Sequence, residues 1–324
     1  MDLPQLIISG SVAIDRIMHF DGLYKEHILP EKVHTLSLSI FIDSLRDTDG
    51  GIGANIAYSL ALLGEKPVLL GSLGKRDFAY KERLTELGVD TTHLYLSDLP
   101  TASFTVMTDR DDNQIGGFYP GAMFDSSTLS LKPWFEDDVL VVVSAHDPKM
   151  MKQQVRECKE QNLRLFYDIG QQVTNTPVED LKEGLAQAEL LIVNEYELDV
   201  LSSKVSLRKE EIKKRIPVLV TTFGKLGSVI EGAKVKDLIQ IPIAKPREFT
   251  DPTGAGDGFR AGFLYGYIRN WNLEVCGKLG SVAASFTVEK LGTQEHKFTR
   301  EEFEARFKEN FGEEISLDNY EQRL

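Results

Sequence analysis

The chain has 324 residues, 42% of them hydrophobic, which is enough to bury the core of one large domain or of two closely joined ones. Its 50 Asp and Glu residues against 37 Lys and Arg residues give a formal net charge of -13, which disfavours nucleic acid and anionic membranes as partners. Cys158 and Cys276 form no CxxC pair, and the N-terminal segment lacks the pattern of a signal peptide, so we expect a soluble cytoplasmic protein without a disulfide framework.

Short apolar runs alternate with segments of helical periodicity along most of the chain. The apolar runs predict buried strands at residues 6–13, 68–74, 139–145, 163–169, 190–194 and 218–223. Helical spacing of apolar residues is found at residues 53–64, 78–88, 150–160 and 195–201. The alternation predicts a mostly parallel sheet wrapped by helices. The last third of the chain is richer in helix, at residues 259–270, 273–292 and 301–312.

Two regions break this alternation, residues 16–43 and residues 101–119. They contain alternating or aromatic runs such as VHTLSLSIFI at residues 33–42. We expect them to form a small β-sheet that covers the main sheet as a lid. The alternative is that they are edge strands of the main sheet. With a lid, the α/β core consists of residues 1–15, 44–100 and 120–324.

The stretch FTDPTGAGDGFRAGFL, residues 249–264, places glycines on both sides of a carboxylate where a helix is predicted to begin. Glycines let several backbone N–H groups converge, and a helix N-terminus adds unpaired ones. The candidate donors of such an anion hole are the N–H groups of Gly254, Ala255 and Gly256. Asp257 would then accept the proton of an attacking hydroxyl group, and Arg260 would add positive charge on the same helical face. The alternative is that Asp257 only caps the helix.

The string DPTGAGDGFRAGF at residues 251–263 resembles the C-terminal signature of the PfkB, or ribokinase-like, family of small-molecule kinases. The N-terminal glycine signature of that family is present as GGIGAN at residues 50–55, followed by GSLG at residues 71–74. The resemblance implies a ribokinase-like three-layer α/β/α core with a mostly parallel sheet and a small β-sheet lid. It also implies ATP and Mg²⁺ as cofactors. Within the family, the chain is most similar to adenosine kinases of the prokaryotic type, through residues 9–15, 29–45, 114–123, 194–201, 251–264 and 291–295.

The resemblance implies roles for residues on the ATP side of the site. Asp257 corresponds to the catalytic base, and the Gly254–Gly256 turn corresponds to the anion hole. Asn194 and Glu197 match an Asn-x-x-Glu motif that helps to hold Mg²⁺ and the triphosphate, with Glu197 acting through water. The same spacing also fits an N-terminal helix cap. The residues that match the stretch along ATP are Thr222, Gly224 and Gly227, with Lys225 either adding charge there or lying exposed in a turn.

Other residues are implied on the nucleoside side. Asp15 matches the residue that hydrogen-bonds the ribose hydroxyls, although a solvated turn residue is the alternative. Phe104 and Phe118 resemble an aromatic pair that sandwiches the purine; their alternative is packing within the lid. Gln171 and Gln172 resemble a polar pair near the nucleoside, although Ile169-Gly170 replaces the usual Pro-Ser. The remaining candidates for substrate binding are Ser11, Ser39, Gly51, Asn55 and Arg260.

These observations predict an adenosine kinase that transfers the γ-phosphoryl group of ATP to the 5′-hydroxyl of adenosine, giving AMP and ADP. One alternative is a kinase of the same family that acts on another nucleoside or on a ribose or fructose derivative. A second is a nucleoside-binding sensor without catalytic activity. The resemblance also makes a homodimer plausible, with the alternating segment LSLSIFI at residues 36–42 as the place of contact.

Overall fold

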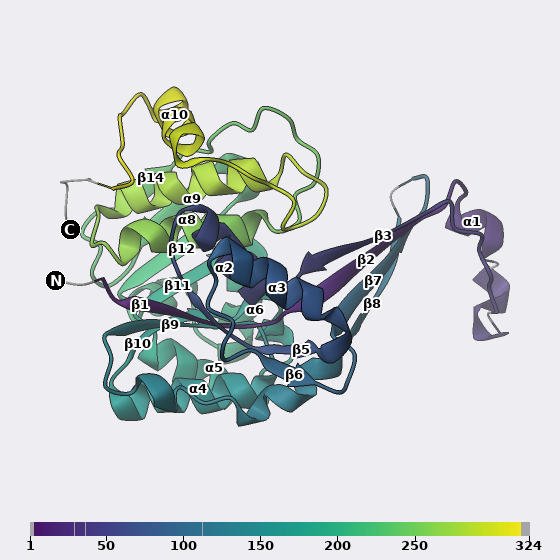
Figure 1. Cartoon of the computed structure of the whole chain (residues 1–324), viewed down its shortest axis with the longest axis horizontal. Helices are drawn as coiled ribbons and strands as arrows, with labels where there is room; N and C mark the ends of the chain where they lie inside the picture. Colours follow the sequence, from purple (N-terminus) through teal and green to yellow (C-terminus); the bar gives the residue numbers. More distant parts are fainter. Residues whose placement is uncertain (1–2, 29, 36, 112, 319–324) are drawn as a thin grey trace.

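The computed structural model describes residues 3–28, 30–35, 37–111 and 113–318. Its centre is an eight-stranded sheet with the order β14-β13-β12-β11-β10-β9-β1-β4 (Figure 1). The parallel part consists of β1 (Gln5–Ser9), β4 (Val68–Leu70), β9 (Val139–Ser144), β10 (Arg164–Asp168), β11 (Leu190–Asn194) and β12 (Val218–Thr222). An antiparallel hairpin of β13 (Ser228–Glu231) and β14 (Ile239–Ile241) extends the sheet at one edge.

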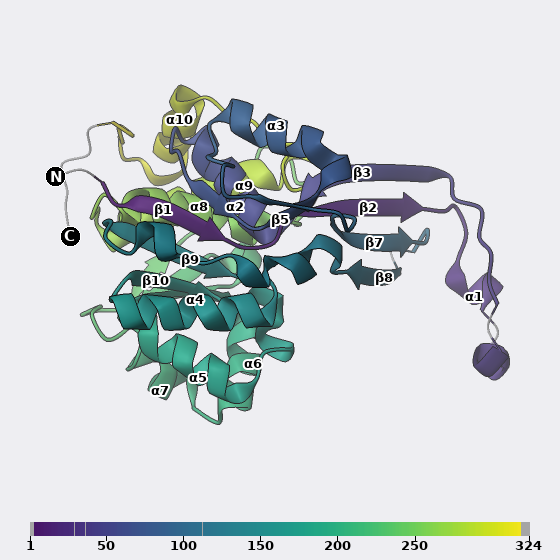
Figure 2. The ribbon, with the colours of Figure 1, turned by 60° about the horizontal axis from the view of Figure 1, so that its bottom comes forward.

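Helices cover both faces of this sheet, because successive residues of a buried strand point to opposite sides. Leu6 and Ile8 belong to one core, and Ile7 belongs to the other. The helices on the side of Leu6 and Ile8 are α2 (Ile52–Leu62), α3 (Phe78–Leu87), α8 (Ala255–Tyr267), α9 (Leu273–Thr287) and α10 (Arg300–Phe311). Those on the opposite side are α4 (Pro148–Gln161), α5 (Val178–Gln187), α6 (Glu195–Val205) and α7 (Lys209–Lys213). The predicted three-layer α/β/α core is confirmed (Figures 1 and 2).

A second sheet with the order β3-β2-β7-β8 projects from one end of the core (Figure 1). Its strands are β2 (Ala13–His19), β3 (Ser44–Gly50), β7 (Ala102–Thr108) and β8 (Gln114–Tyr119). A small separate sheet was predicted, and it is found; the alternative of edge strands on the main sheet is wrong. Two predicted boundaries differ. Residues 13–15 were assigned to the core but begin β2 of the small sheet. Residues 44–50 were also assigned to the core and instead pair with β2 along their whole length. Their sequence, SLRDTDG, is too polar for a buried core strand.

Between β2 and β3 the chain forms an arm that extends beyond the small sheet (Figures 1 and 2). The arm contains α1 (Tyr24–His27) and the 3-10 helix η1 (Pro30–Thr35). The contact strand expected at residues 36–42 is not found: residues 37–42 have no regular secondary structure, and Leu36 lies outside the described residues. An alternating pattern forms a strand only where a neighbouring edge accepts its hydrogen bonds, and β3 begins to pair with β2 at Ser44.

The remaining elements differ from the predictions in a few places. The run at residues 68–74 is interrupted at Gly71, so β5 (Ser72–Gly74) leaves the main sheet and pairs with β6 (Tyr95–Ser97). The helix expected at residues 273–292 ends at Thr287. The other 3-10 helices are η2 (Lys75–Asp77), η3 (Gly121–Thr128), η4 (Lys132–Trp134), η5 (Gly170–Thr174) and η6 (Gly224–Leu226). Within the described ranges, no helix has the length and apolar character that a bilayer crossing requires.

Candidate active site

The candidate residues gather where the parallel strands end and the small sheet begins. β10 ends at Asp168, β11 ends at Asn194 and β12 ends at Thr222. Ligands of open α/β sheets bind outside the carboxyl ends of the parallel strands. The N-terminus of α8 contributes to this edge, since Gly256 and Thr222 line the same cavity. The turn after residue 250 and the ends of these strands therefore form one site.

The turn before α8 requires a glycine at Gly254. This residue has φ of 78°, which side chains disfavour, and a Cβ atom there would lie 3.0 Å from Thr293. The carbonyl oxygen of Gly254 accepts hydrogen bonds from the N–H groups of Asp257 and Gly258. The N–H group of Ala255, one of the predicted anion-hole donors, donates to the carbonyl oxygen of Pro252 at 3.2 Å. An anion in this turn would therefore compete with that bond for Ala255.

Asp257 is buried, with an exposed fraction of 7%. Its Oδ2 accepts a hydrogen bond from Asn55 Nδ2 at 2.8 Å, and its Oδ1 lies 3.4 Å from Arg260 Nη1. Burial raises the pKa of Asp257 to about 7, and repulsion from Asp168 and Glu197 adds to the rise, while Arg260 and Asn55 act in the opposite direction. A carboxylate with a pKa near neutrality is suited to accept a proton from an alcohol.

Arg260 lies within a cluster of carboxylates rather than facing an open surface. Its Nε is 2.7 Å from Asp168 Oδ1, its Nη1 contacts Asp257, and its Nη2 lies 3.9 Å from Glu197 Oε2. Arg260 was predicted from the sequence to bind substrate. Because its guanidinium group is already engaged by these three carboxylates, the first role of Arg260 in the structure is to hold the cluster together. A contact with substrate stays a prediction.

Asn194 and Glu197 form the helix cap that was the alternative interpretation of their spacing. Asn194 Oδ1 accepts from the Glu197 N–H at 2.7 Å, and Glu197 Oε2 accepts from the Asn194 N–H at 2.9 Å. Both residues also line a small cavity of about 50 Å³ together with Thr222, Gly256 and Arg260. The described ranges contain no cluster of three or more His, Cys, Asp or Glu residues that could hold a metal ion. Mg²⁺ that keeps several water ligands needs fewer protein groups than such a cluster supplies.

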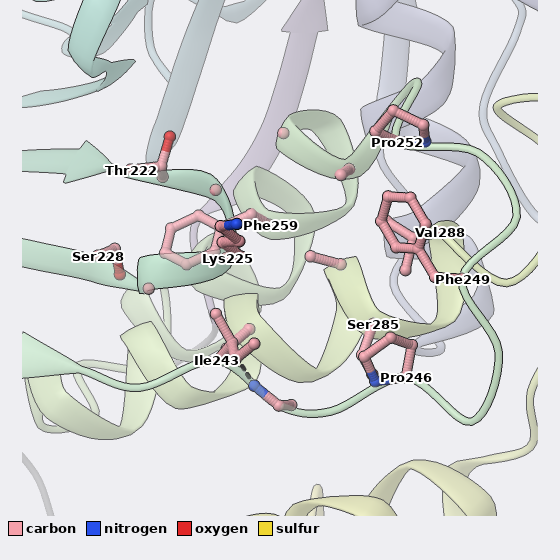
Figure 3. Close-up of a pocket in the computed structure, with 17 residues that line it drawn as sticks. Thr222, Lys225, Ser228, Ile243, Pro246, Phe249, Pro252, Phe259, Ser285 and Val288 are labelled. Atoms are coloured by element: carbon pink, nitrogen blue, oxygen red, sulfur yellow. Dashed lines mark hydrogen bonds between the residues drawn. The ribbon is translucent and has the colours of Figure 1, made fainter.

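A larger cavity of about 600 Å³ lies beside the start of α8 (Figure 3). The predicted ATP residues that line it are Thr222, Gly224, Lys225 and Gly227, joined by Ala255 and Gly256. Asp257 lines neither cavity; it follows Gly256 directly. The lining residues that the sequence analysis missed include Phe249, Phe259, Ser281, Ser285 and Val288. Three of them, Ser281, Ser285 and Val288, recur at helical spacing along and just after α9, within the segment that was predicted only as a helix.

The glycine segment at residues 50–55 makes room for Asp15. A Cβ atom on Gly50 would lie 2.3 Å from Asp15 Oδ2, so only glycine leaves space for that carboxylate. Gly51 has φ of 95°, and Ser11 Oγ accepts from the Ile52 N–H at 3.0 Å, which holds the start of α2. Burial raises the pKa of Asp15 to about 6, and repulsion from Asp251 adds to the rise.

Asp15 and the two predicted aromatic residues form one row across the small sheet. Asp15 is the register partner of Phe104, and Phe104 is the register partner of Phe118. Residues in register point to the same face of a sheet, so all three side chains share one face. Phe104 is 40% exposed and Phe118 is 51% exposed. Because both residues are exposed to this extent, packing within the small sheet alone does not explain them.

Two predicted residues lie apart from this row. Ser39 is exposed in the arm between β2 and β3. Gln172 is half-buried, and its Nε2 donates to the carbonyl oxygen of His146 at 2.9 Å, while Gln171 is exposed. The structure therefore gives Gln172 a partner within the protein, and the predicted contacts of Ser39 and Gln172 with substrate stay predictions.

Known proteins of one family are similar to this chain in sequence and in fold. The model of the pfkB family of carbohydrate kinases matches residues 11–300 of the chain. The chain belongs to the pfkB family. A curated relative of this kinase, the nucleoside kinase of Methanocaldococcus jannaschii, is 33% identical over 267 residues, covering 82% of this chain and 87% of the relative.

Solved structures of the family match the kinase over nearly its whole length. A nucleoside kinase from Burkholderia thailandensis in complex with inosine has a TM-score of 0.84 and 32% sequence identity, covering 95% of this chain and 99% of that one. The same protein in complex with ADP-inosine has a TM-score of 0.82 and 34% identity, covering 95% and 97%. The predicted family and the ribokinase-like fold are therefore confirmed.

We expect kcat of the kinase to rise with pH through the pKa of Asp257, which is about 7 in the free protein. A general base works only when deprotonated, so a raised pKa makes the protonated, inactive form abundant below neutrality. Initial rates at saturating substrates across the pH range test this. The Asp15→Asn variant is the control, because burial raises the pKa of Asp15 as well, but Asp15 is predicted to bind ribose and not to act as the base. The kcat of this variant should keep the same acid limb. A kcat that is flat from about pH 5 to about pH 9 would contradict Asp257 as the base.

Proposed function

We propose that the kinase transfers the γ-phosphoryl group of ATP to the 5′-hydroxyl of a nucleoside, with adenosine as the first candidate. The observation that carries the proposal is the position of Asp257. This buried carboxylate follows Gly256, which lines the large cavity, and it is hydrogen-bonded to Asn55 in the glycine segment beside Asp15. The similarity to nucleoside kinases of two other organisms supports the substrate class.

On the donor side, the mostly apolar cavity would take the base of ATP, and its phosphates would extend toward Gly256 at the start of α8. The carboxylate of Glu197 and the amide of Asn194 supply oxygen atoms of the kind that Mg²⁺ prefers, acting through water. When bound, Mg²⁺ would neutralise charge on the phosphate oxygens. Lys225 at the edge of the cavity adds one positive charge of the protein.

On the acceptor side, Asp257 takes the proton of the 5′-hydroxyl as the new O–P bond forms. The bond between the γ-phosphorus and the bridging oxygen breaks, and ADP leaves with that electron pair. The N–H groups of Gly254 and Gly256 and the N-terminus of α8 stabilise the charge on the transferred group. Closure of the small sheet over the site would exclude water, which otherwise competes with the hydroxyl for the phosphoryl group.

The choice of nucleoside rests on the row formed by Asp15, Phe104 and Phe118. Asp15 can accept hydrogen bonds from ribose hydroxyls, and the two rings can stack on a base. Inosine is a second candidate, because the Burkholderia thailandensis kinase was solved with that nucleoside. A coupled assay of ADP release against adenosine, inosine, guanosine, cytidine, ribose and fructose tests the proposal. Turnover of ribose alone would overturn the nucleoside assignment, and no turnover of any compound would favour a sensor.

Phe118→Ala is expected to weaken adenosine binding by about 1–3 kcal/mol, the usual contribution of one stacked base. Affinity for ATP should stay close to that of the unaltered protein, since Phe118 belongs to the small sheet and not to the large cavity. Phe249→Ala is the matched variant, because Phe249 lines the large cavity and its loss should weaken ATP instead. Calorimetric titration with each ligand separates the two effects. Equal losses of both ligands in Phe118→Ala would count against a stacked nucleoside.

The predicted homodimer also stays a proposal, with a different contact strand. Residues 37–42 form no strand, whereas β8 lies at the open edge of the small sheet and is exposed along its whole length. An unpaired edge strand offers free N–H and C=O groups to a second chain. We therefore propose β8 as the place of contact between two copies.

A further inference from the structure

The segment LGTQE at residues 291–295 is part of the resemblance to the family, but none of the roles described above belongs to it. Its Gln294 is 3% exposed and contacts three other side chains. Gln294 Nε2 donates to Asn55 Oδ1 at 2.8 Å and to Tyr80 Oη at 2.6 Å. Gln294 Oε1 accepts from Arg83 Nη2 at 2.6 Å. Every polar hydrogen of this amide is thus used inside the protein.

These hydrogen bonds link Arg83 to Asp257 through Gln294 and Asn55. The direction of each bond follows from the two residues at the ends of this series. Arg83 has only donors, and an ionised Asp257 has only acceptors. Gln294 must therefore present its oxygen to Arg83 and its NH₂ group to Asn55. Asn55 in turn presents its oxygen to Gln294 and its NH₂ group to Asp257 Oδ2. The orientation of the Asn55 amide is set by protein neighbours and needs no substrate.

The same group of residues holds the end of β3 in the small sheet. Arg83 Nε donates to Asp49 Oδ2 at 2.8 Å, and Tyr80 Oη donates to the carbonyl oxygen of Gly50 at 2.8 Å. Thr293 Oγ1 lies 3.0 Å from Asn55 Oδ1 and 3.1 Å from the carbonyl oxygen of Asp49, so its single proton can serve either. The hydrogen bonds around Gln294 therefore join the small sheet to the residue that contacts Asp257.

We propose that Gln294 is a positioning residue for the catalytic base. It holds the Asn55 amide with its NH₂ group toward Asp257 and ties this arrangement to the end of β3. The inference rests on the proposed function, in which Asp257 is the base. Hydrogen bonds that all run from a cation to a carboxylate polarise one another, which strengthens the last of them. That last bond favours the ionised form of Asp257 and fixes one of its oxygens.

Gln294→Glu tests the proposal with almost no change of shape. The new carboxylate keeps an oxygen toward Arg83 but turns its other oxygen toward Asn55 Oδ1, so two acceptors would meet. Asn55 must then reverse its amide, which removes the donor from Asp257. We expect kcat to fall about 10- to 100-fold, as small misplacements of reacting groups do, with the KM for ATP nearly unchanged. The acid limb of kcat should also move to higher pH, since Asn55 no longer favours the ionised base.

The charged groups that face Asp257 from other positions stay in place in this variant. They are Arg260 on the same helix, Asp168 from β10 and Glu197 from α6. Gln161→Glu is the matched control, because it makes the same chemical change at an exposed position at the end of α4. We expect it to leave kcat, KM and the pH profile unchanged.

A double variant shows whether Gln294 acts through Asn55. In an Asn55→Ala background, Gln294→Glu should cause no further loss of kcat, because the link to Asp257 is already absent. If the double variant lost kcat by the product of the two single losses, the proposal would be overturned. A Gln294→Glu enzyme that is less stable but turns over at the original rate would also overturn it. Asp257→Asn is assayed in parallel. If Asp257→Asn stays active, the proposed function fails. If Asp257→Asn is inactive and Gln294→Glu is fully active, only the inference about Gln294 is refuted.

Discussion

Asp257→Asn is expected to lower kcat of phosphoryl transfer by about 10²–10⁴-fold, the usual contribution of a general base. Asparagine has the size of aspartate and fits the same buried position, but its amide cannot accept the proton of the hydroxyl group. Affinity for the nucleoside and for ATP should change little, because the lining of the large cavity does not include Asp257. Rates of ADP release together with equilibrium binding of each substrate measure the two quantities separately.

The control for Asp257→Asn is Asp237→Asn, which makes the same change at an exposed residue before β14. It should turn over like the unaltered kinase. An Asp257→Asn enzyme with nearly full activity would show that another group accepts the proton. A variant that loses both binding and turnover would instead point to a role of Asp257 in holding the site together, because a base alone does not contribute to ground-state binding.

Arg260→Met is expected to lower the free energy of unfolding by about 3–5 kcal/mol, the range seen when one partner of a buried ion pair is removed. Methionine replaces the apolar stem but not the charge. Asp168 is fully buried, and it would lose the guanidinium 2.7 Å away, while Asp257 and Glu197 would lose a shared counter-charge. Denaturant unfolding of the two proteins at neutral pH measures the difference.

The loss of unfolding free energy in Arg260→Met should become larger as the pH rises. Without the guanidinium, the pKa values of Asp168 and Asp257 rise further above their values in the unfolded chain. The folded variant then binds protons that the unfolded chain releases, so its stability falls as pH rises above the unfolded pKa. Arg208→Met is the control, since Arg208 is 80% exposed and pairs with Glu211 at the surface. Arg208→Met should change the free energy of unfolding little at any pH. If Arg260→Met had an equally small effect, this would contradict a role of Arg260 in the cluster.

Much of the fold follows from local patterns in the sequence. The run LLIVN was predicted as a strand and is β11 without a change of boundary, because uninterrupted apolar residues suit a strand covered on both faces. The alternating pattern of residues 36–42 predicted a strand, and this prediction was wrong for residues 37–42. Alternation predicts a strand only if a partner edge is present, and the arm provides none to residues 37–42. The polar strand β3 was missed for the opposite reason, since its partner β2 rather than its own composition makes it a strand.

The residues of the candidate site could be named from the sequence, but several of their partners could not. The glycine turn and Asp257 were found because a turn and a helix start are encoded within a few neighbouring residues. The spacing of Asn194 and Glu197 fitted both a cap and a metal site, and the structure has the cap. Nothing near Gln294 in the sequence indicates that its amide meets Asn55.

Local patterns along the chain were therefore sufficient for most strands and helices of the core and for the glycine turn before α8, and the two glycine signatures were sufficient for the family. The folded arrangement was needed to learn that Arg260 is enclosed by Asp168, Asp257 and Glu197, and that Asn55 donates to Asp257 across 202 positions of sequence. The physical reason is burial. A charged or amide group removed from water must find a partner among whatever residues the sheet and helices bring beside it, and that choice depends on contacts between distant segments.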